Sequence, residues 1–208
     1  MKYLFIDTST SNLNVSILED SNVIYSYNNF ILSDMASKIM VIIDEALTKS
    51  NLSLNDIDKI FVVNGPGSFT GIRVGVTVAK TIAWALQKPI IPISSLEVIA
   101  TTSFNTKYCI SMIDARRGNV FAGVYDNELN CIEEDKLISL ESILSNKNKD
   151  YTIISYDNIA DSIKPHINVS KIILKHKNDK PLVAHSLNPH YLKLTEAEEN
   201  KLKNDSKN

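Results

Sequence analysis

The chain is poor in the residues that mark disulfide-stabilised, metal-binding or membrane-spanning proteins. Its 208 residues include two cysteines, six glycines, six prolines, four histidines and one tryptophan. Cys109 and Cys131 form no CxxC motif and no disulfide framework, which is typical of a reducing compartment. No run approaches the ~20 apolar residues of a transmembrane helix, and Asp7 interrupts the apolar N-terminus too early for a signal peptide. The sequence therefore predicts a soluble, cytoplasmic protein that does not associate with membranes.

The chain also lacks a large net charge of either sign. Its 22 basic and 24 acidic residues give a formal net charge of −2. This balance excludes the overall basic field with which free-standing nucleic-acid-binding proteins collect phosphates, and leaves room only for a local basic patch. Hydrophobic residues make up 44% of the chain and charged residues 22%, which excludes a disordered or fibrous protein.

Hydrophobic periodicity predicts an α/β protein. In the first half, strands are expected at residues 3–6, 13–19, 23–27, 59–63 and 90–93. Helices are expected from a cap at Ser33 or Asp34 to about Lys49, over about 72–86, and from a cap at Ser94 or Ser95 to about Thr102. This order is typical of a mixed sheet with helices packed on it, and it resembles the ribonuclease-H-like lobe of the actin and sugar-kinase superfamily.

The second half of the chain is more polar and its pattern is weaker. Strands are expected at residues 108–113, 119–125, 129–134 and 151–155, with weak helices in the remainder and a charged tail over residues 196–208. The segment 104–107 separates the two sets of strands. We therefore predict an N-terminal lobe of residues 1–104 and a smaller C-terminal lobe of residues 105–208.

Four of the six glycines lie in one segment between a predicted strand and a predicted helix. Gly65, Gly67, Gly71 and Gly75 occur where glycine-rich loops cradle phosphates. The spacing is GxGxxxG rather than the GxGxxG of dinucleotide-binding proteins, and no P-loop lysine follows the second glycine. Two interpretations remain open. One is an anion contact, and the other is a tight turn in which glycine permits positive φ and close approach of the helix to the sheet.

The helix after this loop has an unusually wide apolar surface. Gly71, Gly75, Ala79 and Ala83 form a stripe of small residues at every fourth position. With the surrounding aliphatic residues, the apolar sector covers about 220° of the helix, beyond the ~100° that packing on one core surface needs. Small residues at this spacing permit close approach of another helix. We expect a partner protein on this surface; the alternative is a helix enclosed between the sheet and a neighbouring helix of the same lobe.

Patterns of catalytic and metal-binding residues are weak. The histidines are His166, His176, His185 and His190. They form no HxxxH pair, no serine lies in a GxSxG motif, and Ser9, Ser68 and Ser95 have no neighbouring histidine in sequence. The sequence therefore predicts no catalytic residue, no metal site and no cofactor. The candidates for a vestigial anion or nucleotide site are Asp7, Thr8, Gly65, Gly67, Ser68 and Asp114. Asp114, Arg116 and Arg117 either offer charges to an anion or RNA or form a solvated hairpin end.

Several segments resemble the TsaB (YeaZ) family, the non-catalytic subunits of the bacterial machinery that makes threonylcarbamoyladenosine in tRNA. These segments are Leu4–Thr10, Gly65–Gly75, Ser94–Glu97, Asp114–Gly118 and, more faintly, Pro189–Lys193. The similarity extends over residues 1 to about 125 and is thin beyond them. It implies an actin-like (ASKHA, ribonuclease-H-like) two-lobed fold with mixed sheets and a reduced second lobe.

The resemblance also implies partners. Members of this family bind and activate a TsaD-like transferase, together with a TsaE-like ATPase, for the modification of adenosine 37 in ANN-decoding tRNAs. TsaD-like enzymes carry an HxxxH metal pair in the first-lobe helix, whereas residues 35–47 here contain no histidine, and this chain is far shorter than such an enzyme. Both departures favour a non-catalytic subunit.

In the family, the first helix and the post-loop helix form a four-helix contact with TsaD, and the same surface often mediates self-association. The contact candidates that carry over are Met35, Ile39, Ile42, Val74, Val78 and Ile82. We therefore expect a homodimer when the chain is alone, and contact with tRNA only through the complex. Whether Lys80, Arg116 and Arg117 contact tRNA stays open.

Two enzymatic functions remain as alternatives. An actin-fold enzyme with its own ATP site would use Asp7, the Gly65–Gly71 loop and Asp114. A glycoprotease-like hydrolase would need a metal or a nucleophile, neither of which the sequence displays.

Overall fold

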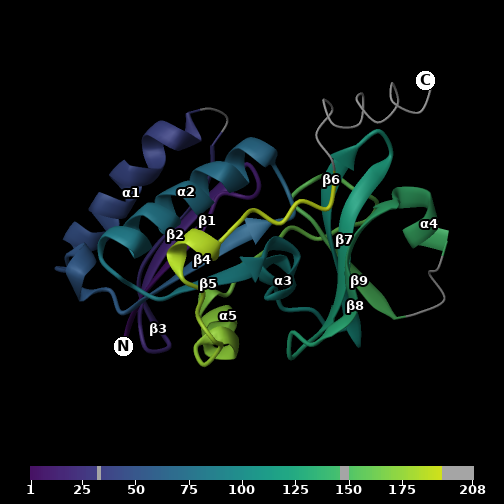
Figure 1. The fold of residues 1–208 in the computed structure, drawn as a ribbon. Coiled ribbons are helices and arrows are strands. Elements are labelled where there is room, and N and C mark those ends of the chain that lie inside the picture. Colours follow the sequence, from purple (N-terminus) through teal and green to yellow (C-terminus); the bar gives the residue numbers. More distant parts are fainter. Residues whose placement is uncertain (32–33, 146–149, 194–208) are drawn as a thin grey trace, which may run out of the picture.

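The computed structural model describes residues 1–31, 34–145 and 150–193 and contains two sheets with helices packed around them (Figure 1). The first sheet has the order β3-β2-β1-β4-β5. Its strands are β1 (Lys2–Asp7), β2 (Asn12–Glu19), β3 (Asn22–Phe30), β4 (Lys59–Gly65) and β5 (Ile90–Ser94). The first three strands form an antiparallel meander, and β4 and β5 run parallel to β1. All five strands expected from the periodicity of the first half are present.

Two pairs of helices cover the two faces of this sheet. α1 (Met35–Lys49) and α2 (Phe69–Ala85) lie side by side on one face, over a core that contains Leu4 and Ile6 of β1 (Figure 1). α3 (Ser95–Ala100) and α5 (Val169–His176) belong to the core of the other face, which contains Tyr3 and Phe5. Because successive strand residues point to opposite faces, β1 supplies side chains to both cores.

The ends of α1 and α2 differ in detail from the prediction. α2 begins three residues before the expected Ile72, because Ser68 caps it: the Ser68 Oγ accepts the N–H of Gly71 at 3.2 Å. Asp34 precedes α1 with a left-handed backbone (φ 62°), and its carbonyl oxygen accepts the N–H groups of Ser37 and Lys38 at 3.1 Å. Ser33, the other expected cap, lies outside the described residues.

The second sheet has the order β8-β7-β6-β9. Its elements are β6 (Tyr108–Arg116), β7 (Asn119–Asp126), β8 (Cys131–Ser139) and β9 (Tyr151–Ile154), with α4 (Leu140–Ser145) after β8. β6, β7 and β8 are antiparallel, whereas β9 runs parallel to β6. The strand expected at residues 129–134 begins at Cys131, because Leu129 lies in a turn with φ 65° and its N–H donates to the carbonyl oxygen of Asp126 at 3.0 Å.

The C-terminal part of the described chain returns to the first sheet. The short helices η1 (Leu54–Asp56) and η2 (Ala184–Ser186) flank this sheet, and α5 packs in its core. We refer to residues 182–193 as the C-terminal strap; it begins beside β5, where the Leu182 N–H donates to the Ile90 carbonyl oxygen at 2.9 Å. The prediction assigns α5 and the strap to the C-terminal lobe of residues 105–208; in the structure α5 also contacts β3, and the strap contacts β5 and α2. The expected tail over residues 196–208 lies outside the described residues.

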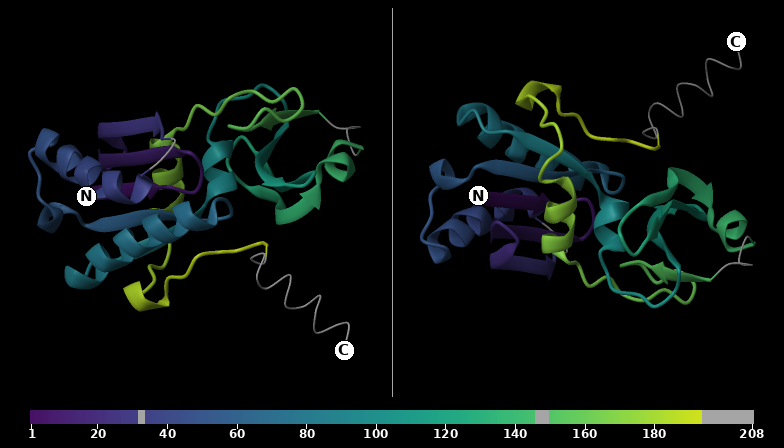
Figure 2. Two further views of the ribbon diagram at one scale, coloured as in Figure 1. Left: turned by 90° about the horizontal axis from the view of Figure 1, so that it is seen from above. Right: turned by 90° about the horizontal axis from the view of Figure 1, so that it is seen from below.

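One hydrophobic cluster joins the two lobes. It contains Phe5 and Phe61 of the first sheet, Leu96 of α3, and Cys109 and Phe121 of the second sheet, all buried. α3 lies between the sheets, close to β6 and β7 (Figure 2). The lobes therefore share a core.

Candidate functional site

The glycine-rich loop packs tightly against the turn that follows β1. A Cβ atom at Gly67 would lie 2.2 Å from the carbonyl oxygen of Ser9. At Gly71 a Cβ atom would lie 2.1 Å from the carbonyl oxygen of Thr8, and at Gly75 it would lie 2.2 Å from the Thr8 Oγ1. Real Cβ atoms do not approach other atoms this closely, so a larger residue at any of these positions forces the loop and the turn apart. The glycines permit close packing between β1 and α2.

The polar groups of this corner are partnered inside the protein. The Thr8 Oγ1 donates to the Gly71 carbonyl oxygen at 2.7 Å, and the Ser68 N–H donates to the Ser9 carbonyl oxygen at 2.8 Å. The Asp7 Oδ1 accepts from both the N–H (2.8 Å) and the Oγ (2.7 Å) of Ser9. Burial raises the pKa of Asp7, and the two Ser9 donors offset this in part. Of the two interpretations left open by the sequence, this geometry favours the tight turn.

Asp114, the remaining candidate for the anion site, lies in the other lobe. It is exposed near the end of β6, where its Oδ1 accepts the N–H of Arg116 at 2.7 Å. Its own N–H donates to Asp157 at 2.8 Å. Arg116 and Arg117 both have positive φ, at 64° and 56°. The structure therefore brings Asp7, Thr8 and the loop together and places Asp114 near the end of β6, in the other lobe.

The C-terminal strap covers the outer side of the glycine-rich loop. The His190 N–H donates to the Asn64 carbonyl oxygen at 2.7 Å, and a Cβ atom at Gly65 would lie 2.4 Å from the His190 carbonyl oxygen. The Tyr191 ring stacks on Phe69 with a centroid distance of 4.7 Å. The faint motif near the C-terminus is therefore a packing partner of the loop, which sequence spacing alone does not reveal.

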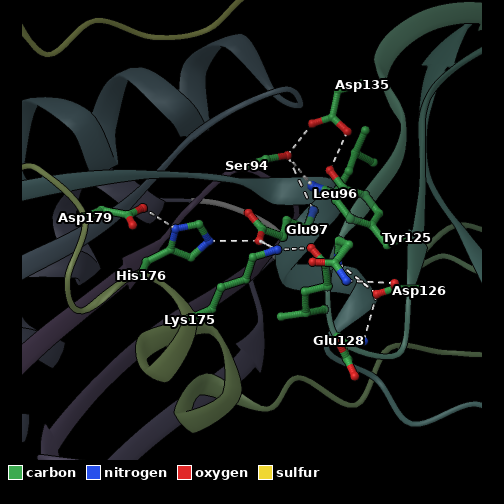
Figure 3. Close-up of polar contacts among 12 residues, drawn as sticks. Ser94, Leu96, Glu97, Tyr125, Asp126, Glu128, Asp135, Lys175, His176 and Asp179 are labelled. Carbon is green, nitrogen blue, oxygen red and sulfur yellow. Dashed lines mark hydrogen bonds and ion pairs between the residues drawn. The ribbon is translucent and has the colours of Figure 1, made fainter.

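A polar network at α3 joins the two lobes (Figure 3). The Ser94 Oγ caps α3 by accepting the N–H of Leu96 at 3.1 Å, and it donates to Asp135 of β8. The Tyr125 hydroxyl of β7 donates to the other oxygen of the same carboxylate at 2.6 Å. Burial raises the pKa of Asp135, although the two hydroxyl donors oppose this effect. Asp135 and Tyr125 lay outside every sequence motif, so the sequence analysis missed them.

The second half of this network joins α3 to α5. The Glu97 Oε1 contacts the His176 Nε2 at 2.8 Å and the Lys175 Nζ at 3.0 Å (Figure 3). The His176 Nδ1 lies 2.6 Å from the Asp179 carboxylate. Burial lowers the pKa of His176, but its hydrogen bonds to Glu97 and Asp179 outweigh burial, so the pKa lies above the ordinary value of 6.5. The raised pKa means that these contacts favour the protonated imidazole, so His176 links α3 and α5 most strongly in its charged form.

Replacing His176 by alanine tests this link through its pH dependence. Because the folded-state pKa is raised, the stabilisation is complete below the unfolded pKa of about 6.5 and is lost as the pH rises through the folded value. We expect His176→Ala to lower the free energy of unfolding by about 1.5–3 kcal/mol at pH 6, with a smaller loss at pH 9. Urea denaturation across this range measures it, with the exposed His166→Ala as the matched control. A loss that is the same at every pH would contradict the charged link.

Three of the six residues predicted to contact a partner are buried within the chain. Ile39, Ile42 and Ile82 are buried, with exposed fractions of 0%, 6% and 6%, and belong to the core under α1 and α2. Gly71 and Gly75 of the small-residue stripe face Thr8, so the stripe serves packing within the chain rather than contact with another helix. Much of the wide apolar sector of α2 is therefore covered by the protein itself.

Other apolar side chains of the two helices remain accessible. Val41 and Met40 of α1 are 65% and 46% exposed. Met35, Val74 and Val78, the other three predicted contact residues, are half-buried. We refer to these five residues as the α1–α2 face. The five residues come from two helices that lie side by side over the sheet (Figure 1).

The described residues show no constellation of metal ligands. No group of three or more histidine, cysteine, aspartate or glutamate side chains in residues 1–31, 34–145 and 150–193 is arranged to hold a metal ion. Within the same residues, no helix is long and apolar enough to cross a membrane.

Comparisons with known proteins identify the family. A family model described as TsaD, tRNA N6-adenosine threonylcarbamoyltransferase, matches residues 33–201. The tRNA threonylcarbamoyladenosine biosynthesis protein TsaB of Bacillus subtilis (strain 168) is 31% identical over 221 residues, which cover 95% of this chain and 96% of that protein. The chain belongs to the TsaB (YeaZ) family. A solved structure of YeaZ from Pseudomonas aeruginosa shares the fold, with a TM-score of 0.78 and 22% identity over 92% of this chain and 99% of that one.

The structure has the two-lobed α/β architecture expected from the sequence, with a mixed sheet in each lobe. The chain also resembles part of a TsaD enzyme. The tRNA N6-adenosine threonylcarbamoyltransferase of Staphylococcus haemolyticus (strain JCSC1435) is 36% identical over 108 residues, which cover 43% of this chain and 31% of that enzyme. The likeness to this enzyme is thus confined to less than a third of its length.

The segments that carry the TsaB resemblance contact one another in the structure. The Ser95 Oγ donates to the Pro66 carbonyl oxygen, which joins the start of α3 to the glycine-rich loop. The Lys193 Nζ donates to the Ala115 carbonyl oxygen at 3.0 Å, which joins the strap to the β6–β7 turn. The turn after β1 and the strap both pack on the loop, as described above. The segments that carry the resemblance therefore contact one another where the two lobes meet.

Proposed function

We propose that this chain is an accessory subunit of tRNA threonylcarbamoyladenosine synthesis that binds and activates a TsaD-like transferase. The observation that carries the proposal is the α1–α2 face. Val41 and Met40 expose aliphatic surface on a helix whose opposite side is fully used by the core. Exposed aliphatic residues on two adjacent helices are typical of a helix-to-helix protein interface.

The remaining parts of the proposal follow from the family. A TsaE-like ATPase joins the pair, and L-threonine, bicarbonate and ATP reach adenosine 37 of ANN-decoding tRNAs through a separate threonylcarbamoyl-AMP synthase and the TsaD-like subunit. Catalysis resides in the partner, and the complex works in the cytoplasm. The glycine-rich loop packs closely against the turn after β1, where Asp7 is buried, which supports a structural rather than a phosphate-binding role for this corner.

Co-elution with a TsaD-like partner tests the proposal. We expect the purified chain and the partner from the same organism to elute from a size-exclusion column as one complex at micromolar concentration. Alone, the chain should elute as a homodimer, which the partner then displaces because both use the α1–α2 face. Separate elution of the two proteins at this concentration would refute the accessory function.

Calorimetry with Mg-ATP tests the alternative of an enzyme with its own ATP site. Asp7 is buried, and its Oδ1 accepts two hydrogen bonds from Ser9 in the turn where such an enzyme would place phosphates. We expect no heat of binding up to millimolar nucleotide for the isolated chain. Saturable binding would instead support the enzymatic alternative.

A further inference from the structure

α2 and the C-terminal strap form a surface to which neither segment contributes an acidic residue. The sequence contains no aspartate or glutamate between Lys59 and Leu96, and none between Lys180 and Lys193. α2 and the strap contribute Arg73, Lys80 and Lys193 to this surface. α2 and the strap therefore each carry a net positive charge, although the net charge of the whole chain is −2.

The cations of this surface contact neutral oxygen atoms. The Lys80 Nζ donates to the Leu187 carbonyl oxygen at 2.9 Å, and the Arg73 Nε donates to the Tyr191 hydroxyl at 2.7 Å. Lys193 likewise donates to a backbone carbonyl. Within the part of the chain that the structure describes, none of these three side chains pairs with a carboxylate. Hydrogen bonds thus hold these charges in place, and no carboxylate of the described residues pairs with them.

The same surface contains a groove beside α2. It has a volume of about 360 Å³ and is lined by Thr77, Lys80, Thr81, Trp84 and His185. Trp84, the single tryptophan of the chain, is 73% exposed. α2 lies between α1 and the segment that carries η2, so the groove is on the flank of α2 that faces η2, away from α1 (Figure 2). A partner on the α1–α2 face would therefore leave the groove accessible.

We propose that this groove and the cations along α2 bind RNA directly, with an unpaired base stacked on Trp84 and the adjacent phosphates on Lys80, Arg73 and Lys193. An exposed aromatic ring beside cations and hydroxyl groups is the arrangement with which proteins hold unstacked bases. Trp84 and Arg73 are eleven residues apart on one helix, or roughly 16 Å, which lets the backbone of a short single-stranded segment follow α2. The charge of the surface also suits an acidic polypeptide, but the exposed indole in the groove favours a nucleobase.

This inference rests on the proposed function, because a loop of the tRNA substrate is the RNA that such a complex presents. It adds a direct contact to a subunit expected to meet tRNA only through the complex. The co-elution experiment described above measures only whether the chain forms a complex with the TsaD-like partner, and does not depend on RNA binding. A complex that forms while the isolated chain fails to bind RNA would overturn this inference and leave the accessory function standing.

The fluorescence of Trp84 provides a direct test, since no other tryptophan contributes to the signal. We expect an unmodified tRNA transcript with an ANN anticodon to quench this fluorescence saturably at 50 mM salt. With about three phosphate contacts, the logarithm of the association constant should fall against the logarithm of the salt concentration with a slope of about −2. Absence of saturable quenching up to 200 μM RNA would overturn the inference.

Charge reversals in the groove provide the specific test. Lys80→Glu should weaken RNA binding about tenfold, and so should Thr81→Glu, which adds a negative charge at an exposed position. Lys107 is exposed in the segment before β6, and Lys107→Glu should change the affinity for RNA by less than about twofold. Trp84→Ala should weaken the binding of fluorescein-labelled RNA, followed by anisotropy, about tenfold. An equal loss with Lys107→Glu would reduce the effect to overall charge and overturn the inference. Equal quenching by poly-glutamate would overturn it in favour of an acidic protein partner.

Discussion

Replacing Gly67 by alanine is expected to lower the free energy of unfolding by about 3–5 kcal/mol, from the sum of backbone strain and overpacking. Gly67 has φ 150°, a conformation that residues with a Cβ rarely adopt, and its Cβ would lie 2.2 Å from the Ser9 carbonyl oxygen. That oxygen also accepts the N–H of Ser68, so moving the loop away breaks this hydrogen bond as well. Urea denaturation of the purified variant measures the loss.

Gly118→Ala is the matched control for this prediction. Gly118 also has positive φ, at 73°, but a Cβ there would meet no atom within 4 Å. The same substitution should therefore cost only the left-handed backbone penalty, about 1–2 kcal/mol. If Gly67→Ala costs no more than Gly118→Ala, the loop is not packed as described, and the phosphate-binding interpretation regains its support.

The position of the glycine-rich loop could be predicted from the sequence, but its packing partner could not. The spacing identified a special backbone segment between a strand and a helix, and the structure confirms that position. What the glycines approach could not be read from the spacing, because Thr8 and Ser9 lie some sixty residues away along the chain. A phosphate and a polypeptide turn can both approach such a loop closely only where the loop residues have no Cβ atom.

The helix positions were predictable for a different reason. Strands and helices of the first lobe have apolar residues at regular spacing, so their existence followed from the period. The burial of Ile39 and Ile82 could not be predicted in this way. The period defines an apolar sector of the helix, but it does not show how much of that sector the protein's own sheet covers. Three parts of the protein cover α2: the first sheet, the turn after β1 and the strap. Together they cover more of the helix than a single core surface would.

The C-terminal elements escaped prediction because their contacts are non-local. His176 pairs with Glu97 across seventy-nine residues, and the strap packs against a loop more than a hundred residues earlier. A short amphipathic helix such as α5 has the same pattern whichever lobe it joins. The family motifs Ser94–Glu97 and Pro189–Lys193 marked the relevant residues, but only the structure reveals that the first anchors α5 and the second covers the loop.

Charged substitutions on the α1–α2 face are expected to weaken the complex with a TsaD-like partner at least a hundredfold. Val41→Lys and Val78→Glu place opposite charges on the same face, so the result does not depend on the sign of the charge. A charge that is buried in an interface without a partner costs about 3–5 kcal/mol, which exceeds the ~2.8 kcal/mol of a hundredfold change. Size-exclusion co-elution and a titration of the labelled chain measure the affinity.

The fold should survive these changes, which makes the test specific. Val41 is 65% exposed, and lysine is a better helix former than valine, so the unfolding midpoint of Val41→Lys should equal that of the parent chain. Ile132→Lys on β8 makes the same kind of change at a 46% exposed position of the other lobe and should leave the complex intact. If Val41→Lys and Val78→Glu both bind as tightly as the parent, the α1–α2 face is not the docking surface. If Ile132→Lys also abolishes binding, the partner uses the second lobe too, and the face alone does not explain the association.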